Sequence, residues 1–373
     1  MRIGILTYDY DPPIGGLGVV AKASRKVLEK LSSQDTFIAI SPSSGADDRV
    51  SLLAAIFWRK FGGCPLFSLI LFLQLPSLIR KHRLDLLHLH AGSGGVFLLR
   101  KPSCPLVMMS HHTYLQEAEI VFLHAPLKGV WKKIMARLEK RTYSFADKIV
   151  CVSKDTADFI IDRYQQPRSK VTVIENFVED CRRQRLIPKS ASTILFVGRL
   201  EERKGVTVLL EAMKFVAAKK PDVRLRLLGE NLMGDRIFKF IESKKLQDVI
   251  SVSGYVHDPL LFREMLNATV LVVPSLLEGF GLVAAQGMLA GTCVLASDAP
   301  GLRSVIRDHQ TGLLFRSGDA ADCARAILEI LNDPVLRSRL EQQGREDALK
   351  RFSPEERMKD LHRVFEIALT LCK

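Results

Sequence analysis

The sequence predicts two α/β units in tandem, each built around a parallel β-sheet with helices on both faces. A chain of 373 residues is too long for one ordinary core and suits two domains of about 180 residues each. The hydrophobic fraction of 47% and the charged fraction of 25% are typical of folded globular proteins. Short apolar runs alternate with amphipathic segments along the chain, which is the pattern of parallel sheets.

The first half of the chain contains one such alternating series. The expected strands are Arg2–Thr7, Thr36–Ile40, Leu84–His90, Leu106–Ser110, Lys148–Val152 and Val171–Ile174. The helix-like segments between them include Leu17–Leu31, Leu127–Phe145 and Lys154–Tyr164. Because alternation of this kind joins consecutive strands into one parallel sheet, it predicts a Rossmann-like domain over residues 1–180.

A polar, basic stretch at 177–192 interrupts the series and predicts a linker over residues 181–192. The strands expected after it are Thr193–Val197, Arg224–Leu228, Ile250–Ser253, Val270–Val273, Val294–Ser297 and Thr311–Phe315. They define a second Rossmann-like domain over 193–352, followed by a terminal helix over 353–373 that could pack back on the first domain. Ligands bind at the carboxyl ends of such strands, so two facing units would form a cleft there.

The seven cysteines form no CxxC pair, and several fall in apolar runs. Reduced thiols in a cytosolic protein are therefore expected, without a disulfide framework or a zinc site. No secretory signal is expected, because the run Met1–Thr7 is strand-like and is followed at once by a loop. The longest apolar stretch, Pro65–Ile79, contains a glutamine and an internal proline and falls short of the roughly 20 residues that a spanning helix needs. It is expected to form a buried or interfacial helix.

The net charge is +13, and residues 51–148 hold 14 Lys/Arg and 5 Asp/Glu, so 14 − 5 = +9 comes from this segment. Such a field attracts phospholipid, nucleic acid or a phosphorylated substrate. No RNP, helix-turn-helix or zinc pattern supports nucleic acid. The apolar runs Leu52–Phe57 and Pro65–Ile79 are edged by cations, and Trp131 lies beside others, as suits a membrane interface. The alternative is that these runs are core helices and the charges only aid solubility.

The most informative motif is Pro274–Gly291, in which a strand leads into a glycine-flanked turn and then a helix. Gly279 and Gly281 allow a tight turn and close approach to a ligand. Glu278 stands just before the helix, and Gln286 lies one turn into it. The amides that would bind an anion at the helix start belong to Phe280, Gly281 and Leu282. An ordinary strand–turn–helix is the alternative for the bare pattern.

These residues resemble the signature of glycosyltransferase family 4, in which two glutamates flank seven residues. Glu278 fills the first place, and Gln286 stands where the second glutamate is expected. The resemblance implies that Glu278 contacts hydroxyls of the donor sugar and that residue 286 holds the ribose of the nucleotide. A glutamine can still accept one ribose hydroxyl, but it lacks the charge, which costs about 1 kcal/mol of binding.

The resemblance covers nearly the whole chain. Phe196–Gly205 looks like the family loop whose Arg199 and Lys204 would stabilise the departing diphosphate, since fixed cations lower the barrier to breaking a glycosyl–phosphate bond. The alternative is two solvated surface cations. The other residues that the resemblance places at the donor are Gly229, Asn231, Tyr255 and Val256 in the second half, and Gly15 and Gly16 in the first.

Histidines cluster at the ends of two expected strands. By resemblance, His112 is the histidine next to the donor sugar, and His111 is the reserve. His88 and His90 share one side of their strand, but no third metal ligand accompanies them. The triplet Asp9–Asp11 spells the metal-binding DxD pattern of the other major glycosyltransferase architecture, but it precedes the Gly-Gly loop and is interpreted as incidental.

The resemblance implies a GT-B enzyme with an N-terminal acceptor domain and a C-terminal donor domain. It would transfer a sugar from a nucleoside diphosphate sugar to an acceptor hydroxyl with retention, without metal or other cofactor. The expected acceptor is a lipid or saccharide of the cell envelope, reached from the cytoplasm or from the inner face of an anionic membrane. Two alternatives stay open: a nucleotide-sugar epimerase of the same fold, and a non-catalytic binder in which Gln286 marks decay.

Overall fold

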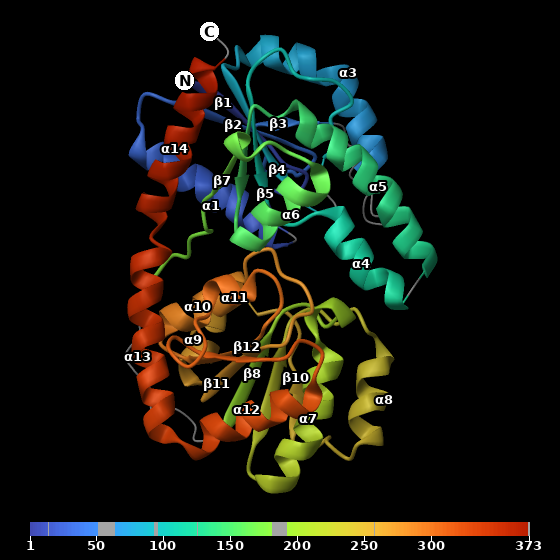
Figure 1. Cartoon of the computed structure of the whole chain (residues 1–373), viewed down its shortest axis with the longest axis vertical. Coiled ribbons are helices and arrows are strands. Elements are labelled where there is room, and N and C mark those ends of the chain that lie inside the picture. The colour runs from blue at the N-terminus through green and yellow to red at the C-terminus, as the bar shows by residue number, and fades with distance from the viewer. Residues whose placement is uncertain are drawn as a thin grey trace. The chain divides into compact units, whose positions relative to one another are not determined.

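The computed structural model describes residues 1–13, 15–50, 64–92, 96–124, 126–180, 192–256 and 258–371, which form two compact units (Figure 1). Unit 1 contains Met1–Asn176 and Pro354–Lys373, and unit 2 contains Phe177–Ser353. The terminal helix therefore belongs to unit 1, although it follows unit 2 along the chain. The expected linker at 181–192 lies outside the described residues except for Ser192.

Unit 1 is organised by a parallel sheet of seven strands in the order β3-β2-β1-β4-β5-β6-β7. These strands are β1 (Arg2–Leu6), β2 (Thr36–Ser41), β3 (Asp48–Arg49), β4 (Leu86–Ala91), β5 (Leu106–Ser110), β6 (Lys148–Cys151) and β7 (Val171–Val173). In the register, Ile3 pairs with Phe37 on one side and with Leu86 on the other. Chain order reverses between β1 and β4, and such a switch point is where ligands bind in open α/β sheets.

The helices of unit 1 are α1 (Gly16–Leu31), α3 (Cys64–His82), α4 (Tyr114–His124), α5 (Pro126–Phe145), α6 (Lys154–Tyr164) and α14 (Pro354–Thr370). Helix α14 contributes to this core from the far end of the chain. Phe365 packs edge-on against His88 of β4 with ring centroids 5.0 Å apart, and His362 Nε2 lies 2.7 Å from a carboxylate oxygen of Asp35. The two contacts fix α14 over the unit-1 sheet.

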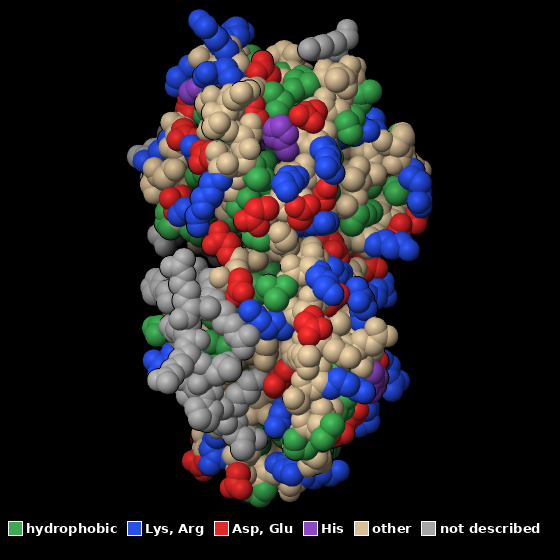
Figure 2. All heavy atoms as spheres, turned by 90° about the vertical axis from the view of Figure 1, so that its left-hand side faces the viewer, with side chains coloured by type: hydrophobic (Ala, Val, Ile, Leu, Met, Phe, Trp, Pro, Cys, Tyr) green, Lys and Arg blue, Asp and Glu red, His purple; other side chains and the backbone are tan. Residues whose placement is uncertain are grey.

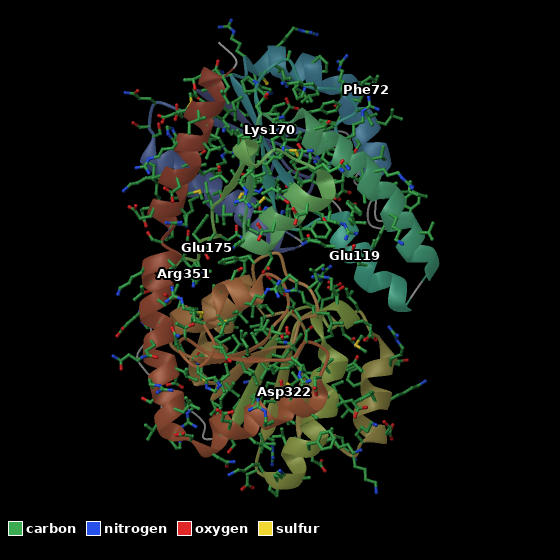
Figure 3. All side chains as sticks on the ribbon, in the orientation of Figure 1. Phe72, Glu119, Lys170, Glu175, Asp322 and Arg351 are labelled. Carbon is green, nitrogen blue, oxygen red and sulfur yellow. The ribbon has the colours of Figure 1, made fainter. Side chains whose placement is uncertain are left out.

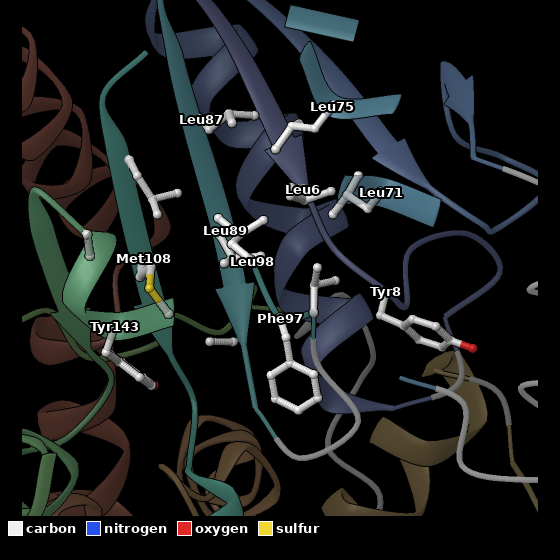
Figure 4. Close-up of a cluster of buried hydrophobic side chains, with 14 of the residues drawn as sticks. Leu6, Tyr8, Leu71, Leu75, Leu87, Leu89, Phe97, Leu98, Met108 and Tyr143 are labelled. Atoms are coloured by element: carbon white, nitrogen blue, oxygen red, sulfur yellow. The ribbon is translucent and has the colours of Figure 1, made fainter. Parts of the chain in front are cut away.

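Helix α3 contains the long apolar stretch and has two different sides. Leu71 and Leu75 are buried against strand residues such as Leu6 and Leu89 (Figure 4). On the opposite side, Leu73 is 70% exposed. The expectation of a buried helix therefore holds for one side of α3, and an interfacial role of the exposed side stays a prediction.

No helix in the described part of the chain is long and apolar enough to span a membrane. The second apolar run, at 52–57, falls outside the described residues.

Unit 2 repeats the plan with six parallel strands in the order β10-β9-β8-β11-β12-β13. The strands are β8 (Thr193–Val197), β9 (Arg224–Leu228), β10 (Ile250–Val252), β11 (Val270–Val273), β12 (Cys293–Ser297) and β13 (Leu313–Phe315). The helices are α7 (Val206–Lys219), α8 (Asp235–Ser243), α9 (Asp258–Asn267), α10 (Leu282–Ala290), α11 (Leu302–Val305), α12 (Ala320–Asn332) and α13 (Pro334–Arg351). The switch point of this sheet lies between β8 and β11.

Charges of both signs are mixed on the face that Figure 2 presents, where Lys and Arg side chains are interspersed with Asp and Glu. Within the basic segment 51–148, several cations already have acidic partners. These pairs are Lys81 with Asp48, Lys101 with Asp147, and Lys132 with Glu117.

Candidate active site

The loops that follow β8 and β11 carry the charged residues expected to act in the second half of the chain. Arg199 and Lys204 lie after β8, where residues 202–204 form a single 3-10 turn. Glu278 lies after β11, just before α10. Because β8 and β11 are neighbours in the sheet, both loops lie at the switch point of unit 2.

The two loops are in close contact through their backbones. Gly205 has φ +67°, and a Cβ there would lie 1.8 Å from the carbonyl oxygen of Pro274. Only glycine fits such an approach in this conformation. Leu276 N also donates to Arg203 O at 2.9 Å. The backbone therefore holds the side chains of both loops in a fixed relation.

Lys204 and Glu278 form an ion pair at this junction. Lys204 Nζ lies 2.6 Å from Glu278 Oε1, which also accepts a hydrogen bond from Ser275 Oγ at 2.8 Å, and both charged side chains are largely buried. Burial lowers the pKa of Lys204, and the opposing charge of Glu278 reverses this only in part. Burial disfavours the Glu278 carboxylate, but Lys204 and Arg203 outweigh burial and lower the pKa of Glu278. The carboxylate is thus held ionised.

Arg203 belongs to this charged group, although its sequence position did not single it out. Its Nη1 donates to Leu277 O at 3.2 Å, and its Nη2 donates to Glu201 Oε1 at 2.9 Å. Arg199 Nη2 lies 3.2 Å from the same Glu201 oxygen and is more exposed. Both arginines lie in the short run Arg199–Lys204, and no spacing rule distinguishes an inward Arg203 from an outward Arg199.

Helix α10 begins beside Glu278 without a side-chain cap. Its N-cap residue, Gly281, has φ +102°, and a Cβ there would meet Leu302 at 2.6 Å. Phe280 is buried edge-on against Phe352 with ring centroids 5.2 Å apart. Gly279, Leu282 and Gln286 are partly buried around this helix start. The start of α10 therefore presents backbone amides and a dipole that attract an anion.

The remaining residues expected at the donor lie on the neighbouring strand ends. Gly229 has φ +145°, and a Cβ there would lie 2.0 Å from Gly198 O. The amide of Gly229 donates to Gly254 O at 2.6 Å. Gly229 therefore contacts the loops that follow β8 and β10, the two strands beside its own. Asn231 bonds within its own loop, with Nδ2 donating to Gly234 O and Oδ1 accepting from Met233 N. In this conformation Asn231 shapes the loop.

Tyr255 and Val256 follow β10 and were expected near the nucleobase. The tyrosine is 71% exposed, and Val256 is partly buried. An exposed aromatic ring at a strand end can stack on a planar base. Their placement is compatible with that expectation and does not test it.

In unit 1, the Gly-Gly loop follows β1 and leads into α1. Asp9 Oδ2 accepts hydrogen bonds from Gly15 N at 2.8 Å and Gly18 N at 3.2 Å. The chain's own carboxylate therefore interacts with the start of α1, where a donor phosphate was expected near Gly15 and Gly16. Gly16 is exposed.

The DxD triplet has structural partners. While Asp9 binds the start of α1, Asp11 Oδ1 lies 2.9 Å from Lys22 Nζ. Between them, Tyr10 Oη accepts a hydrogen bond from Arg25 at 3.3 Å. Among the described residues, no three His, Cys, Asp or Glu side chains are grouped so that they could hold a metal ion.

His112 follows β5 and lies against the loop after β4. A Cβ on Gly92 would stand 3.5 Å from His112 Cε1 and 3.2 Å from Leu17 at the start of α1. The histidine thus lies beside the β1–β4 switch point of unit 1.

The other histidines of the two clusters are buried. His90 Nδ1 lies 3.1 Å from His111 Nε2. Burial lowers the pKa of His88 to about 4 and the pKa of His111 to about 3. These rings are therefore neutral near pH 7 and pack in the core, whereas His112 is partly exposed.

Family models match both halves of the chain. The model described as "Glycosyltransferase Family 4" matches residues 14–182, and the model described as "Glycosyl transferases group 1" matches residues 177–347. The chain belongs to glycosyltransferase family 4. This family assignment covers both units and agrees with the motif order described above.

Relatives and solved structures agree with the family. The chain is 29% identical over 291 residues to a phosphatidyl-myo-inositol mannosyltransferase of Mycobacterium leprae, covering 77% of this chain and 74% of that one. Sucrose-phosphate synthase of Thermosynechococcus elongatus has the same fold, with a TM-score of 0.83, 20% identity and full coverage of both chains. Anabaena HepE, solved with UDP and glucose, gives a TM-score of 0.73 at 17% identity, covering 98% and 99%. The fold of this glycosyltransferase is therefore GT-B.

Proposed function

We propose that this glycosyltransferase moves a sugar from a nucleoside diphosphate sugar to an acceptor hydroxyl with retention of anomeric configuration. One observation carries the proposal: a buried Lys204–Glu278 ion pair lies beside the uncapped start of α10 at a sheet switch point. A cation and helix amides suit a diphosphate, and a carboxylate suits sugar hydroxyls. The Anabaena protein solved with UDP and glucose supports a donor of this class.

Donor binding would replace the ion pair by contacts of the same kind. A diphosphate oxygen takes the place of Glu278 at Lys204, and donor hydroxyls take the place of Lys204 at Glu278. Each buried charge keeps a partner throughout, which avoids the cost of leaving a charge unpaired. Ser275, which already donates to Glu278, keeps the carboxylate oriented during the exchange.

Departure of the diphosphate leaves charge on phosphate oxygens, and fixed positive groups stabilise it. Lys204, the more exposed Arg199 and the amides at Gly281 and Leu282 supply these groups. A divalent ion has no required role in this scheme. The acceptor hydroxyl attacks from the face that the diphosphate leaves, so no dedicated protein nucleophile is needed.

The proposed acceptor is a lipid or saccharide of the cell envelope, used by an enzyme that docks on the inner face of the membrane. The net charge of +13 and the exposed Leu73 on α3 support an anionic, partly apolar surface as partner. The Mycobacterium leprae relative is named for a phosphatidyl-inositol acceptor, which is compatible with this class.

The test is a thermal-shift screen of the purified chain against a panel of nucleotide sugars, followed by transfer assays with the donor that binds. Proton NMR of the product then gives the anomeric configuration. Absence of stabilisation by every nucleotide sugar would overturn the proposal. Isomerisation of the donor without acceptor would assign the chain to the epimerases, and binding without turnover of any acceptor would favour a non-catalytic binder.

A further inference from the structure

Unit 1 contains a cleft between α3 and the segment 97–103. Its volume is about 410 Å³, within the range of roughly 300–1,000 Å³ that small-molecule sites occupy. The apolar floor is formed by Phe72, Leu75, Pro76 and Ile79 of α3. Figure 3 labels Phe72 on this helix.

Hydrogen bonds to two helices hold the other wall in place. Phe97 N donates to Ser68 Oγ of α3 at 2.9 Å, and Leu98 N donates to Thr142 Oγ1 of α5 at 3.0 Å. The start of segment 97–103 is thus anchored to both helices, and Lys101 Nζ ties its middle to Asp147 at 2.8 Å, so the segment forms a wall of the cleft.

Two arginines stand at the edge of the apolar floor. Arg80 and Arg100 are exposed, and the guanidinium of Arg100 lies 5.0 Å from the ring centroid of Phe72. Neither arginine forms an ion pair with an acidic side chain in the described ranges, whereas the third cation of the cleft, Lys101, pairs with Asp147 at 2.8 Å. Two uncompensated cations over an apolar floor fit a ligand that is both anionic and apolar.

The side of α3 beside the cleft is itself apolar. Leu69 and Leu73 are exposed at successive turns, and with Phe72, Pro76 and Arg80 they follow the i, i+3, i+4, i+7, i+11 spacing of one helix face. Exposed leucines next to arginines are typical of a helix that lies in a membrane interface.

The basic end of the cleft is separate from the candidate active site. Arg80 lies near the C-terminal end of α3, before β4, and Lys101 pairs with Asp147, just before β6, so this end lies at the amino ends of the strands. The other end is nearer the carboxyl edge, where Phe97 packs against Tyr114 with ring centroids 5.4 Å apart. The Gly-Gly loop and His112 follow the carboxyl ends of β1 and β5, so in a parallel sheet they lie at the edge opposite to Arg80 and Lys101.

We propose that this cleft binds one anionic phospholipid of a membrane surface, with an acyl chain along Phe72, Leu75 and Ile79 and the phosphate between Arg80 and Arg100. The lipid would hold unit 1 on the membrane while the carboxyl ends of the strands stay free for the reaction. This inference deepens the membrane part of the proposed function and rests on it, but it does not depend on the transfer chemistry.

The experiment measures partition of the full chain onto phosphatidylcholine vesicles with and without phosphatidylglycerol. The double variant Arg80→Glu with Arg100→Glu should weaken binding to the anionic vesicles by at least about 30-fold, since each basic residue near such a surface contributes about fivefold. The control, Lys219→Glu with Lys350→Glu, makes the same change in net charge at exposed positions of unit 2 and should retain wild-type binding. Equal losses of vesicle binding in both double variants would show that binding depends on general charge attraction. That result would overturn the proposed lipid site in the cleft.

A second measurement tests the lipid rather than its phosphate. Monomeric dihexanoyl phosphatidylglycerol should shift backbone NMR signals of residues 97–103, and Phe72→Ser should weaken that binding at least about tenfold, on the scale of one buried aromatic contact. If inorganic phosphate shifts the same signals with equal affinity, the cleft is a simple phosphate site. That result would overturn the proposal that it binds a phospholipid. Thermal shift by the nucleotide sugar in the same variants reports separately on the active site, so the two proposals fail independently.

Discussion

At the scale of single residues, the charges of the candidate site fall into two kinds. Lys204 and Glu278 are largely buried and depend on each other, because an unpaired buried charge is strongly destabilising. Arg199 pairs with Glu201 at the surface, where an ion pair contributes about 0–1 kcal/mol. Lys204 and Arg199 are therefore both proposed to stabilise the leaving diphosphate, but only Lys204 is expected to matter for the stability of the fold.

This difference gives the first prediction. Arg199→Ala and Lys204→Ala should each lower turnover by about 10²-fold or more, because each removes a preorganised cation. Only Lys204→Ala should also lower the thermal midpoint, since it leaves Glu278 buried and unpaired. Steady-state kinetics and thermal melts measure the two effects. The control is Arg236→Ala, an exposed cation of α8 whose nearest acid is 4.0 Å away. Folded Arg199 and Lys204 variants with near-normal turnover would remove both residues from the mechanism.

The second prediction concerns Gln286, one turn into α10. Gln286→Glu restores the family pattern and adds a charged acceptor for the ribose, which strengthens a hydrogen bond by about 1 kcal/mol. The Michaelis constant for the donor should fall or stay unchanged, with activity retained. If the Gln286→Glu variant folds well by circular dichroism yet has lost all activity, this ribose site has diverged from the family.

The third prediction comes from a buried acid outside the candidate site. Burial raises the pKa of Glu139 to about 8, although the hydroxyl of Tyr164 and the amide of Tyr114 donate to its Oε2. The folded state then holds a proton that the unfolded state has released. Stability should therefore fall as pH rises from about 4.5 to 8, by at most about 1.4 kcal/mol per pH unit from this group, and be constant above that range.

The variant Glu139→Gln isolates this effect, because the amide oxygen can accept the same hydrogen bonds without titrating. Urea unfolding at several pH values gives the difference in stability between wild type and variant. That difference should change in favour of the variant as pH rises. Parallel pH profiles of the two proteins would show that Glu139 does not titrate in this range.

At the scale of an element, α3 explains why a long apolar stretch is no membrane span. One side of the helix packs on the unit-1 sheet through Phe67 and Leu71, which are fully buried. The other side exposes Leu69 and Leu73 and lines the cleft with Phe72. Hydropathy summed along the stretch does not separate these sides, but the helical period does.

The fourth prediction compares two leucines of this helix. Leu71→Ala should destabilise unit 1 by about 2–5 kcal/mol, because it leaves a cavity against the sheet, whereas Leu73→Ala should change stability by at most about 0.5 kcal/mol. Urea unfolding followed by tryptophan fluorescence reports on unit 1, since both tryptophans, Trp58 and Trp131, fall within its residue range. Equal losses from the two variants would show that α3 does not pack by the side described.

At the scale of the whole molecule, positive charge is available without a metal. The chain carries a net charge of +13, and the acidic triplet nearest the Gly-Gly loop is already engaged, with Asp9 on the start of α1 and Asp11 on Lys22. Fixed cations and helix amides can then perform the electrostatic role that a divalent ion has in other enzymes.

The fifth prediction follows from this distribution of charge. Transfer activity should survive EDTA at concentrations that strip bound divalent ions, because no step requires one. Activity with and without chelator, on the donor found in the screen, is the measurement. Loss of activity with EDTA and its recovery with manganese or magnesium would return Asp9 and Asp11 to consideration as ligands.

The sequence by itself determined the fold class and the approximate bounds of the expected strands. The predicted helix Lys154–Tyr164 and strands such as Thr193–Val197 have the bounds of α6 and β8. Periodicity and glycine-rich turns are local properties, so they can be read from neighbouring residues. The motif order also indicated family 4, which the family models show. The two-residue strand β3 was missed, because Asp48–Arg49 is too short and polar to have a strand pattern.

Only the tertiary structure decided how the expected residues are paired. It showed that Lys204 meets Glu278, that Arg203 turns inward while Arg199 stays exposed, and that Asp9 reaches the start of α1. It also assigned α14 to unit 1, where Phe365 packs on His88. These contacts join residues that are distant along the chain, and their energy depends on burial and geometry that the folded backbone creates. A sequence pattern can therefore indicate which residues belong to the site, but it does not predict which of them contact one another.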